Sequence, residues 1–256
     1  MSQHILITGA TSGIGHAIAM AAAQAQMDIS FTCIEDNADA LCEALRQAGA
    51  GEVQYRQADL SDGALARAVA SDLIGATGRL DILVNNAGIQ HVDNISQFAA
   101  AAWDKVLAVN LSAAFHMMAA CVPMMTQKGY GRIINIASVH GLVASVNKAA
   151  YVAAKHGLIG LTKTMALETA GTGVTCNAIC PGWVRTPLVE AQIEARAKEK
   201  GTSIEEEAFA LVSEKQPSGA FVSPDEIAQM VLFLTGPASA QITGSQFVMD
   251  GGWTAQ

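Results

Sequence analysis

The chain has 256 residues, of which 51% are hydrophobic and 15% are charged, and its net charge is -8. These values exclude an intrinsically disordered chain and predict a single domain over residues 1–256 with one sizeable core. The negative charge without any basic run excludes the electrostatic footprint of a nucleic-acid-binding protein.

The cysteines favour a reducing compartment over a disulfide framework. Their number is odd and none stands in a C-x-x-C pair, so neither disulfides nor a zinc site is expected. They are Cys33, Cys42, Cys121, Cys176 and Cys180. The first apolar run starts at Ile5, which leaves no room for a targeting segment before it, and no apolar stretch is long enough for a membrane span. We therefore expect a soluble, cytoplasmic protein with no metal and no membrane partner.

Short apolar runs recur along the chain with helix-like stretches between them. They predict strands at residues 5–8, 29–34, 53–56, 82–85, 132–137, 174–179 and 246–249. Alanine-rich helices are predicted at residues 17–26, 39–48, 62–76 and 103–127. The strand runs are continuously apolar instead of alternating, which indicates strands covered on both faces. The pattern predicts an α/β fold with a doubly wound parallel sheet.

Residues 187–216 interrupt this alternation with many charged residues and helical potential but no adjacent strand. They could form a solvated helical pair on the surface, or a helical insertion that closes over a ligand as a lid.

The first predicted strand runs into a glycine-rich turn at residues 8–15, which opens a helix. Gly9, Gly13 and Gly15 would let the backbone approach a pyrophosphate, which free N–H groups at the helix N-terminus would bind. An ordinary glycine-rich turn is the alternative. The position after the first strand favours dinucleotide binding.

The end of the second strand bears on the choice of dinucleotide. A 2′-phosphate requires an Arg or Lys there or in the glycine turn, but the turn carries Ser12 and the strand is followed by Glu35 and Asp36. Either acid could bond the ribose hydroxyls, repel a phosphate or be a solvated loop residue. The sequence favours NAD over NADP.

Tyr151 and Lys155 stand four residues apart, which places them on one face of a helix. A neighbouring ammonium and an oxidised nicotinamide both favour the phenolate, so we expect the pKa of Tyr151 to fall toward neutrality and the phenol to act as a general base. Ser138, just after a predicted strand, could hydrogen-bond the substrate oxygen. A Tyr and a Lys at this spacing also occur by chance.

Together with further motifs in the same order, these residues resemble the short-chain dehydrogenase/reductase family in its single-domain form. The resemblance covers nearly the whole chain. Its motifs are the glycine turn at 9–15, Asp59-Leu60, Asn85-Asn86-Ala87-Gly88, Asn110, Ser138, Tyr151, Lys155, Pro181-Gly182-Trp183-Val184-Arg185-Thr186 and Asp250-Gly251-Gly252.

The resemblance implies a Rossmann-like sheet of seven strands in the order 3-2-1-4-5-6-7, and a homotetramer. It also implies that Asp59 contacts the adenine amino group, that Leu60 offers its backbone amide, and that Asn86 lies along the adenosine ribose. Lys155 would bond the nicotinamide ribose, Asn110 would support a proton-relaying water, and Val184 and Thr186 would meet the carboxamide and phosphate side. The implied cofactor set is Gly9, Thr11, Ser12, Gly13, Ile14, Gly15, Asp59, Leu60, Asn86, Ala87, Gly88, Tyr151, Lys155, Pro181, Gly182, Val184 and Thr186.

A polar set near the expected active centre predicts an anionic substrate. Lys148 stands three residues before Tyr151, where an ammonium could bind a carboxylate as a point charge. Gln90 and His140 could reach the same anion. The predicted substrate-binding set is Gln90, His140, Lys148, Trp183, Gln192 and Trp253. Each of these could instead be solvated or ordinary packing.

The predicted activity is the NAD-dependent oxidation of a short 3-hydroxy carboxylate, with Asn110, Ser138, Tyr151 and Lys155 as catalytic residues. Three alternatives stay open: a reductase of 3-oxoacyl thioesters, a polyol or secondary-alcohol dehydrogenase, and a non-catalytic dinucleotide-sensing protein. The sequence leaves open whether a divalent ion supports the assembly near the C-terminus.

Overall fold

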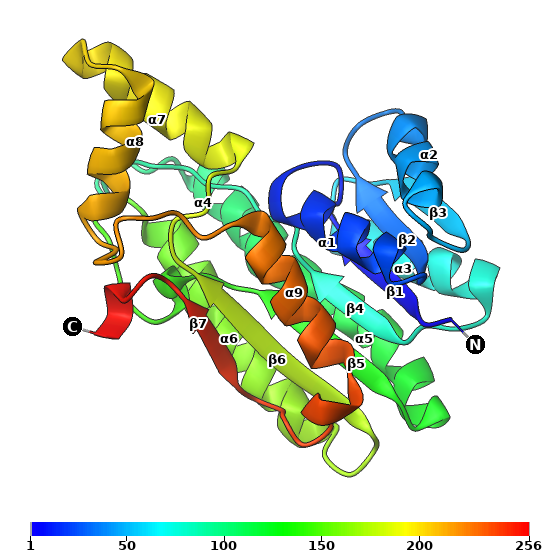
Figure 1. Ribbon diagram of the computed structural model, residues 1–256. Coiled ribbons are helices and arrows are strands. Elements are labelled where there is room, and N and C mark those ends of the chain that lie inside the picture. The colour runs from blue at the N-terminus through cyan, green and yellow to red at the C-terminus, as the bar shows by residue number, and fades with distance from the viewer. Residues whose placement is uncertain (1, 256) are drawn as a thin grey trace.

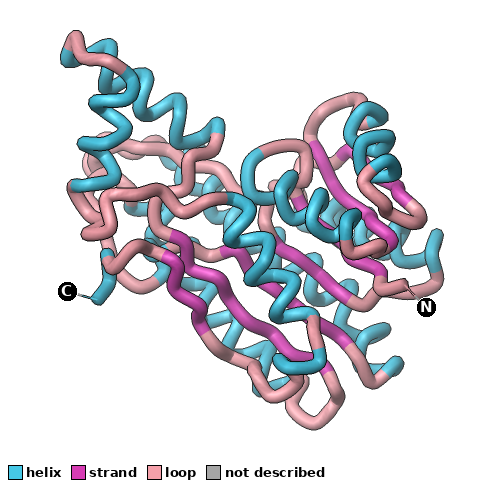
Figure 2. Tube along the Cα trace, viewed as in Figure 1, coloured by secondary structure: helices cyan, strands magenta, loops and turns pink. Residues whose placement is uncertain are grey.

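The computed structural model describes residues 2–255, and its seven strands form one parallel sheet (Figures 1 and 2). The strand order is β3-β2-β1-β4-β5-β6-β7, which confirms the order that the family resemblance implies. The strands are β1 (His4–Thr8), β2 (Asp28–Cys33), β3 (Val53–Gln57), β4 (Ile82–Asn85), β5 (Gly131–Ile136), β6 (Val174–Pro181) and β7 (Gln246–Met249).

Burial explains why the central strands read as continuous apolar runs. Every residue of β1, β2, β4, β5 and β6 is buried, whereas the edge strands β3 and β7 are partly exposed. Helices cover both faces of the sheet, so a strand between them presents no face to water.

The helices form two layers, one on each face of the sheet (Figure 1). Helices α1 (Gly13–Gln24), α2 (Asp39–Gln47) and α9 (Pro224–Thr235) build one core, and α3 (Gly63–Thr77), α5 (Ala113–Lys128) and α6 (Ala149–Glu168) build the other. Helix α9 is not among the predicted elements, although Ser223 and Glu226 form the capping box that marks its start.

The prediction of a single helix over residues 103–127 is wrong in one respect. A π-helical segment, Ala108–Ser112, separates α4 (Ala100–Leu107) from α5. Inside it, Asn110 accepts a hydrogen bond from Ile89 N at 2.8 Å and donates one to Ile89 O at 2.8 Å. Single π turns of this kind are frequent at functional sites. Here the π turn carries Asn110, and the loop that contains Ile89 binds both the oxygen and the nitrogen of its side-chain amide.

The apolar run Ala100–Lys128 is long and apolar enough to span a membrane by length and composition, with a mean hydropathy of 1.6. This finding differs from the expectation that no such stretch exists. The run includes Met117, Met118, Cys121 and Met125, which are fully buried against the sheet. Packing of these residues in the core accounts for part of its hydropathy.

The charged stretch at residues 187–216 forms two helices, α7 (Pro187–Lys200) and α8 (Ile204–Ser213), which project beyond the sheet at the upper left of Figure 1. Their facing sides share a small apolar cluster that includes Val189, Ile193 and Leu211. Arg185 donates hydrogen bonds to Glu190 on α7 and to Glu205 on α8. Charged side chains on the outside and a small apolar seam inside hold this pair together.

Candidate active site

A cleft of about 730 Å³ lies beyond the carboxyl ends of the central strands. The chain reverses its direction of winding between the neighbouring strands β1 and β4, and open parallel sheets bind their ligands at such a switch point. The volume lies within the range usual for cofactor pockets. Its wall runs from the glycine turn after β1 to Tyr151 and Lys155 on α6.

The glycine turn is shaped for close approach of its backbone. Gly9 and Gly13 have positive φ angles of 68° and 54°, a region that glycine enters without strain. A Cβ atom at Gly15 would lie 2.1 Å from the carbonyl oxygen of Gly9. Gly13 and Ile14, the first residues of α1, line the cleft, so the N-terminus of the helix faces a bound anion.

Most of the implied cofactor set lies on the wall of this cleft. These residues are Gly9, Thr11, Ser12, Gly13, Ile14, Asp59, Leu60, Asn86, Ala87, Gly88, Tyr151, Lys155 and Thr186. Gly15, Pro181, Gly182 and Val184 are not among its lining residues. Gly182 instead packs on Gln216, and Val184 is buried and pairs with Val222.

Asn86 has a second role beside its place on the wall. Its side-chain amide donates to Thr8 O and to Gly9 O, both at 2.9 Å. These bonds tie the glycine turn to the loop after β4. The side-chain nitrogen of Asn86, the residue that the resemblance implies along the ribose, is therefore engaged in holding the turn.

The two acids after β2 lie in different environments. Glu35 lines the cleft and accepts a hydrogen bond from Thr11 Oγ1 at 3.0 Å. Asp36 accepts one from Gln57 Nε2 at 2.6 Å and is not among the lining residues. Glu35 is thus the acid beside the glycine turn.

One cation at the cleft was missed. The loop after β2 and the glycine turn carry no positive residue, but Lys105 on α4 also lines the cleft, with Nζ 3.8 Å from Asp59 Oδ2. Lys105 is far from both segments in sequence, so only the fold brings it there.

Tyr151 and Lys155 line the cleft, and Ser138 forms a hydrogen bond with Tyr151. Ser138 follows β5, and the other two lie on α6. Lys155 donates to Ile136 O at 2.8 Å, and its Nζ is 5.6 Å from the centre of the Tyr151 ring. Burial lowers the pKa of Lys155 to about 8.

The groups of the chain alone, without a bound nicotinamide, do not produce the expected fall in the pKa of Tyr151. Burial raises the pKa of this phenol, because a phenolate in a desolvated site is costly, and a hydrogen bond from Ser138 lowers it only in part. Lys155 does not reverse the effect of burial.

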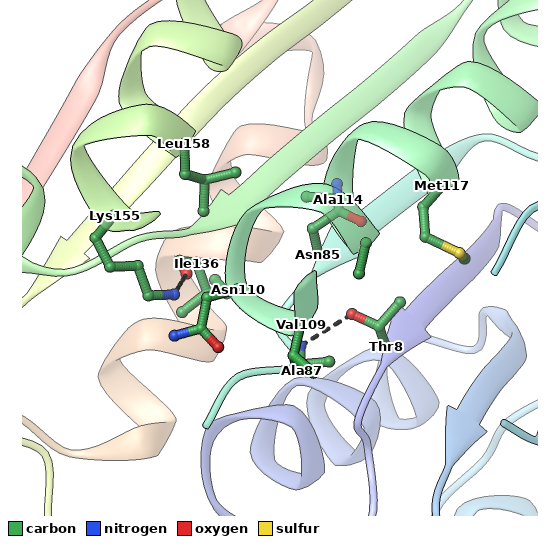
Figure 3. Close-up of a pocket in the computed structure, with 11 residues that line it drawn as sticks. Thr8, Asn85, Ala87, Val109, Asn110, Ala114, Met117, Ile136, Lys155 and Leu158 are labelled. Atoms are coloured by element: carbon green, nitrogen blue, oxygen red, sulfur yellow. Dashed lines mark hydrogen bonds between the residues drawn. The ribbon is translucent and has the colours of Figure 1, made fainter. Parts of the chain in front are cut away.

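Beside Lys155 lies a small cavity of about 10 Å³ (Figure 3), which is close to the space that one water molecule needs. Asn110, Asn85 and Lys155 are among the residues that line it. The side-chain oxygen of Asn85 is buried and has no partner within the described chain. A water in this cavity would satisfy that oxygen beside the predicted relay residue Asn110.

Lys148 is the N-cap residue of α6 and only 9% exposed. Its Nζ lies 4.7 Å from the centre of the Trp183 ring, and burial lowers its pKa to about 8. An ammonium held over an indole face in this way gains a cation–π contact, and within residues 2–255 no carboxylate forms an ion pair with it. A bound carboxylate would supply a counter-ion.

The remaining predicted substrate residues form two groups, an aromatic one that contacts Lys148 through Trp183 and a pair of glutamines. The ring centres of Trp183 and Trp253 are 6.0 Å apart, and those of Trp253 and His140 are 5.4 Å apart. Gln192 on α7 donates to Gln90 Oε1 at 3.2 Å. His140 also packs edge-on to Tyr151, so the aromatic residues of the set extend to the reactive phenol.

The comparisons with known proteins agree with this geometry. A family model described as Enoyl-(Acyl carrier protein) reductase matches residues 9–254. The chain belongs to the short-chain dehydrogenase/reductase family. It is 53% identical to a D-beta-hydroxybutyrate dehydrogenase of Cupriavidus necator, over 98% of this chain and 97% of that protein. A second D-beta-hydroxybutyrate dehydrogenase, from Rhizobium meliloti, is 45% identical over 100% of both chains.

Among solved structures, an actinorhodin polyketide ketoreductase with NADPH superposes with a TM-score of 0.93 at 34% identity, over 100% of this chain and 98% of that one. This member of the short-chain dehydrogenase/reductase family shows the same fold over the full length. The chain is accordingly an oxidoreductase with a Rossmann-type site for a nicotinamide dinucleotide.

Two further residues of the site are absent from the predicted sets. Gln216 is 1% exposed, accepts a hydrogen bond from Trp183 N and donates one to Ala220 O at 2.7 Å, so it fixes the backbone that carries Trp183. Ser145 lies 2.9 Å from His140 Nε2. A lone Gln or Ser in a loop carries no signal in one sequence, and only contacts reveal these residues.

Proposed function

We propose that this enzyme catalyses the reversible, NAD-dependent oxidation of (R)-3-hydroxybutyrate to acetoacetate. The observation that carries the proposal is Lys148, a buried ammonium at the start of the helix that holds Tyr151. A buried charge is costly unless it is paired. A short acid with its carboxylate at Lys148 and its hydroxyl at Tyr151 would supply the pair.

The comparisons support the same substrate class. The two D-beta-hydroxybutyrate dehydrogenases match over the whole chain. Residues 180–189 and 215–218 also resemble the matching segments of D-3-hydroxybutyrate dehydrogenase. The same holds for the set of Gln90, His140, Lys148 and Gln192.

In the proposed mechanism, Tyr151 takes the proton from the substrate hydroxyl and Ser138 orients and stabilises the oxygen. Lys155 stabilises the developing phenolate, and Asn110 helps return the proton to solvent through a water. When bound, the nicotinamide supplies the acceptor for the hydride that leaves the substrate carbon, and its positive charge would lower the pKa of Tyr151.

Positioning contributes more to this mechanism than the base alone. General acid–base help is worth roughly 10²–10⁴-fold. Holding both reactants in line can lower the barrier by roughly 7–11 kcal/mol. Lys148, Gln90 and Gln192 would contribute to the positioning of the substrate.

For the cofactor we propose NAD. The Glu35 carboxylate beside the glycine turn would repel a 2′-phosphate. Lys105 is paired with Asp59 and so is less available to a phosphate.

Helices α7 and α8 are proposed to act as a lid over the substrate within a single domain. Gln192 on α7 reaches Gln90 on the loop after β4. Closure of this pair over a bound acid would exclude water from the reacting atoms.

We propose a cytoplasmic homotetramer that takes a small molecule as its substrate, with no nucleic acid or membrane as partner. The five cysteines are all free and buried, as suits a reducing compartment. The tetramer rests on the family resemblance. Trp103 on α4 and Phe115 on α5 are 36% and 45% exposed and give those helices apolar surface.

The test is a panel of substrates assayed by the absorbance of NADH. The panel holds both enantiomers of 3-hydroxybutyrate, a polyol, a secondary alcohol and, in reverse with NADH or NADPH, acetoacetate and a 3-oxoacyl thioester. We expect kcat/KM to be highest for (R)-3-hydroxybutyrate and acetoacetate. A higher value for the thioester or the polyol would assign the enzyme to those classes, and binding of dinucleotide without turnover would assign it to the sensors.

A further inference from the structure

The segment that carries α7 and α8 is closed at its base by one buried side chain. Gln216 lies at the end of this segment, just after α8, and is 1% exposed. Its Oε1 accepts a hydrogen bond from the backbone N–H of Trp183, which lies between β6 and α7. Its Nε2 donates to Ala220 O at 2.7 Å. A single amide thus joins the two ends of the segment.

The same amide packs between the stretches of chain that carry the two tryptophans of the substrate side. A Cβ atom at Gly182, next to Trp183, would collide with Gln216 Oε1. A Cβ atom at Gly251, two residues before Trp253, would lie 3.2 Å from Gln216 Nε2. Glycine at both positions lets the backbone approach the amide closely.

Trp183 depends on this contact for its position. Its carbonyl oxygen accepts a hydrogen bond from Val222 N at 2.9 Å. Its indole nitrogen is buried and has no hydrogen-bond partner within residues 2–255. Hydrogen bonds therefore hold Trp183 by its backbone, through Gln216 and Val222. A buried N–H that loses its acceptor is costly, so the backbone of Trp183 would shift if Gln216 lost its amide.

The ring of Trp183 connects this backbone to the proposed carboxylate site. One neighbour is Lys148, whose Nζ lies 4.7 Å from the ring centre, and another is Trp253. The ring also packs against the apolar cluster between α7 and α8. A cation–π contact requires the ammonium within about 6 Å of the ring centre. A small displacement of the ring would therefore move the Lys148 ammonium from the place where it would meet a carboxylate.

We propose that Gln216 is a positioning residue for substrate binding: it holds the backbone of Trp183 in place, and the Trp183 ring holds the Lys148 ammonium ready for the carboxylate. Gln216 acts through Trp183 and needs no contact with the substrate. The inference rests on the proposed function, in which Lys148 binds the carboxylate of a short acid.

The test uses Gln216→Met, which keeps the length of the side chain and removes both of its hydrogen bonds. We expect KM for (R)-3-hydroxybutyrate to rise about tenfold, the scale of one buried hydrogen bond, while kcat stays within about twofold. For the neutral methyl ester, kcat/KM should stay within about twofold. A general loosening of the fold would affect the acid and the ester alike.

A double-mutant cycle tests the route through Lys148. In the Lys148→Gln background, Gln216→Met should change KM for the acid less than about twofold, because the ammonium that it positions is gone. An equal rise in both backgrounds, or no rise in either, would overturn the proposal. If Gln216→Met does not fold, Gln216→Asn, whose amide is one methylene too short for both partners, takes its place in the cycle with the same expected results.

The matched control is Ser218→Ala. Ser218 is exposed, lies two residues further along and also contacts Ala220 O, at 3.5 Å. Its substitution should leave KM for the acid unchanged, and a rise equal to that of Gln216→Met would contradict the special part of Gln216. An unaltered enzyme that does not prefer the acid to the ester would refute the proposed function and this inference with it. A preference for the acid that Gln216→Met leaves intact would refute the inference alone.

Discussion

The cofactor side and the substrate side of the active site are built in different ways. The cofactor cleft is open, and much of its wall is backbone near the ends of β1 and β4, shaped by Gly9 and Gly13. The substrate side consists of side chains packed on one another, with Lys148 over Trp183 and Gln192 bonded to Gln90. One side depends on the fold, and the other depends on the identity of a few residues.

This difference separates what the enzyme shares with its family from what is specific to it. The strand order and the glycine turn serve any nicotinamide dinucleotide. With a neutral substrate the buried ammonium of Lys148 would stay unpaired, which is energetically unfavourable. Substitutions on the substrate side should therefore change KM for the acid and leave NAD binding alone, and those on the cofactor side should do the reverse.

The largest effect is expected where the two sides meet. Tyr151→Phe removes the proton acceptor and should lower kcat by roughly 10²–10⁴-fold, while Kd for NAD, from fluorescence titration, stays within about twofold. Retained turnover would remove Tyr151 from the role of base.

The second effect concerns stability on the substrate side. His140 has a pKa of about 4 in the folded enzyme, against about 6.5 when unfolded. The unfolded chain takes up the proton first, so the free energy of unfolding should fall as the pH drops from about 6.5 toward 4. Between pH 7 and pH 5 this one group should contribute about 2 kcal/mol of that fall.

Urea titrations at the two pH values measure the fall. His140→Gln should reduce it, while His4, whose pKa burial also lowers, keeps its share in the variant. Equal falls in the unaltered enzyme and the variant would contradict a buried neutral His140.

A third effect follows from the charge of Lys148. Burial lowers its pKa to about 8, so the ammonium is lost as the pH rises through that value. We expect KM for 3-hydroxybutyrate to rise about tenfold between pH 7.5 and pH 9. In Lys148→Gln the KM should be high and independent of pH over the same range. A flat profile in the unaltered enzyme would show that the lysine does not bind the carboxylate.

The smallest effect is expected at the adenosine end. Glu35→Gln removes the anion beside the glycine turn and should raise kcat/KM with NADP about fivefold relative to NAD. Asp36→Asn is the matched control, because Asp36 is held by Gln57 and should matter less. An equal change in both variants would mean that Glu35 has no special part in the choice of cofactor.

The sequence predicts the framework well because burial leaves a strong signal. The five central strands are buried throughout, since helices cover both of their faces, and they give the clearest apolar runs. The π-helical turn at Asn110 leaves no such signal, because it depends on the backbone of Ile89 in a distant loop.

In the site, the residues that we propose to carry the chemistry are visible in the sequence, and those that support them are not. Tyr151 and Lys155 share a helical face, so spacing alone brings them together. Lys105 and Ser145 reach the site only through the fold. The expected fall in the pKa of Tyr151 rests on an ammonium that is visible in the sequence and on a bound nicotinamide, whereas the burial that raises this pKa leaves no sequence signal.

The central claim is that Lys148 captures the carboxylate of a short acid whose alcohol carbon then faces the cofactor. It is tested most directly by kcat/KM for (R)-3-hydroxybutyrate and for its neutral methyl ester, in the unaltered enzyme and in Lys148→Gln. The unaltered enzyme should prefer the acid by roughly 10–150-fold, as a charge-assisted bond of about 1.5–3 kcal/mol requires, and the variant should lose that preference. Equal turnover of acid and ester by the unaltered enzyme, or an unchanged preference in the variant, would contradict the account.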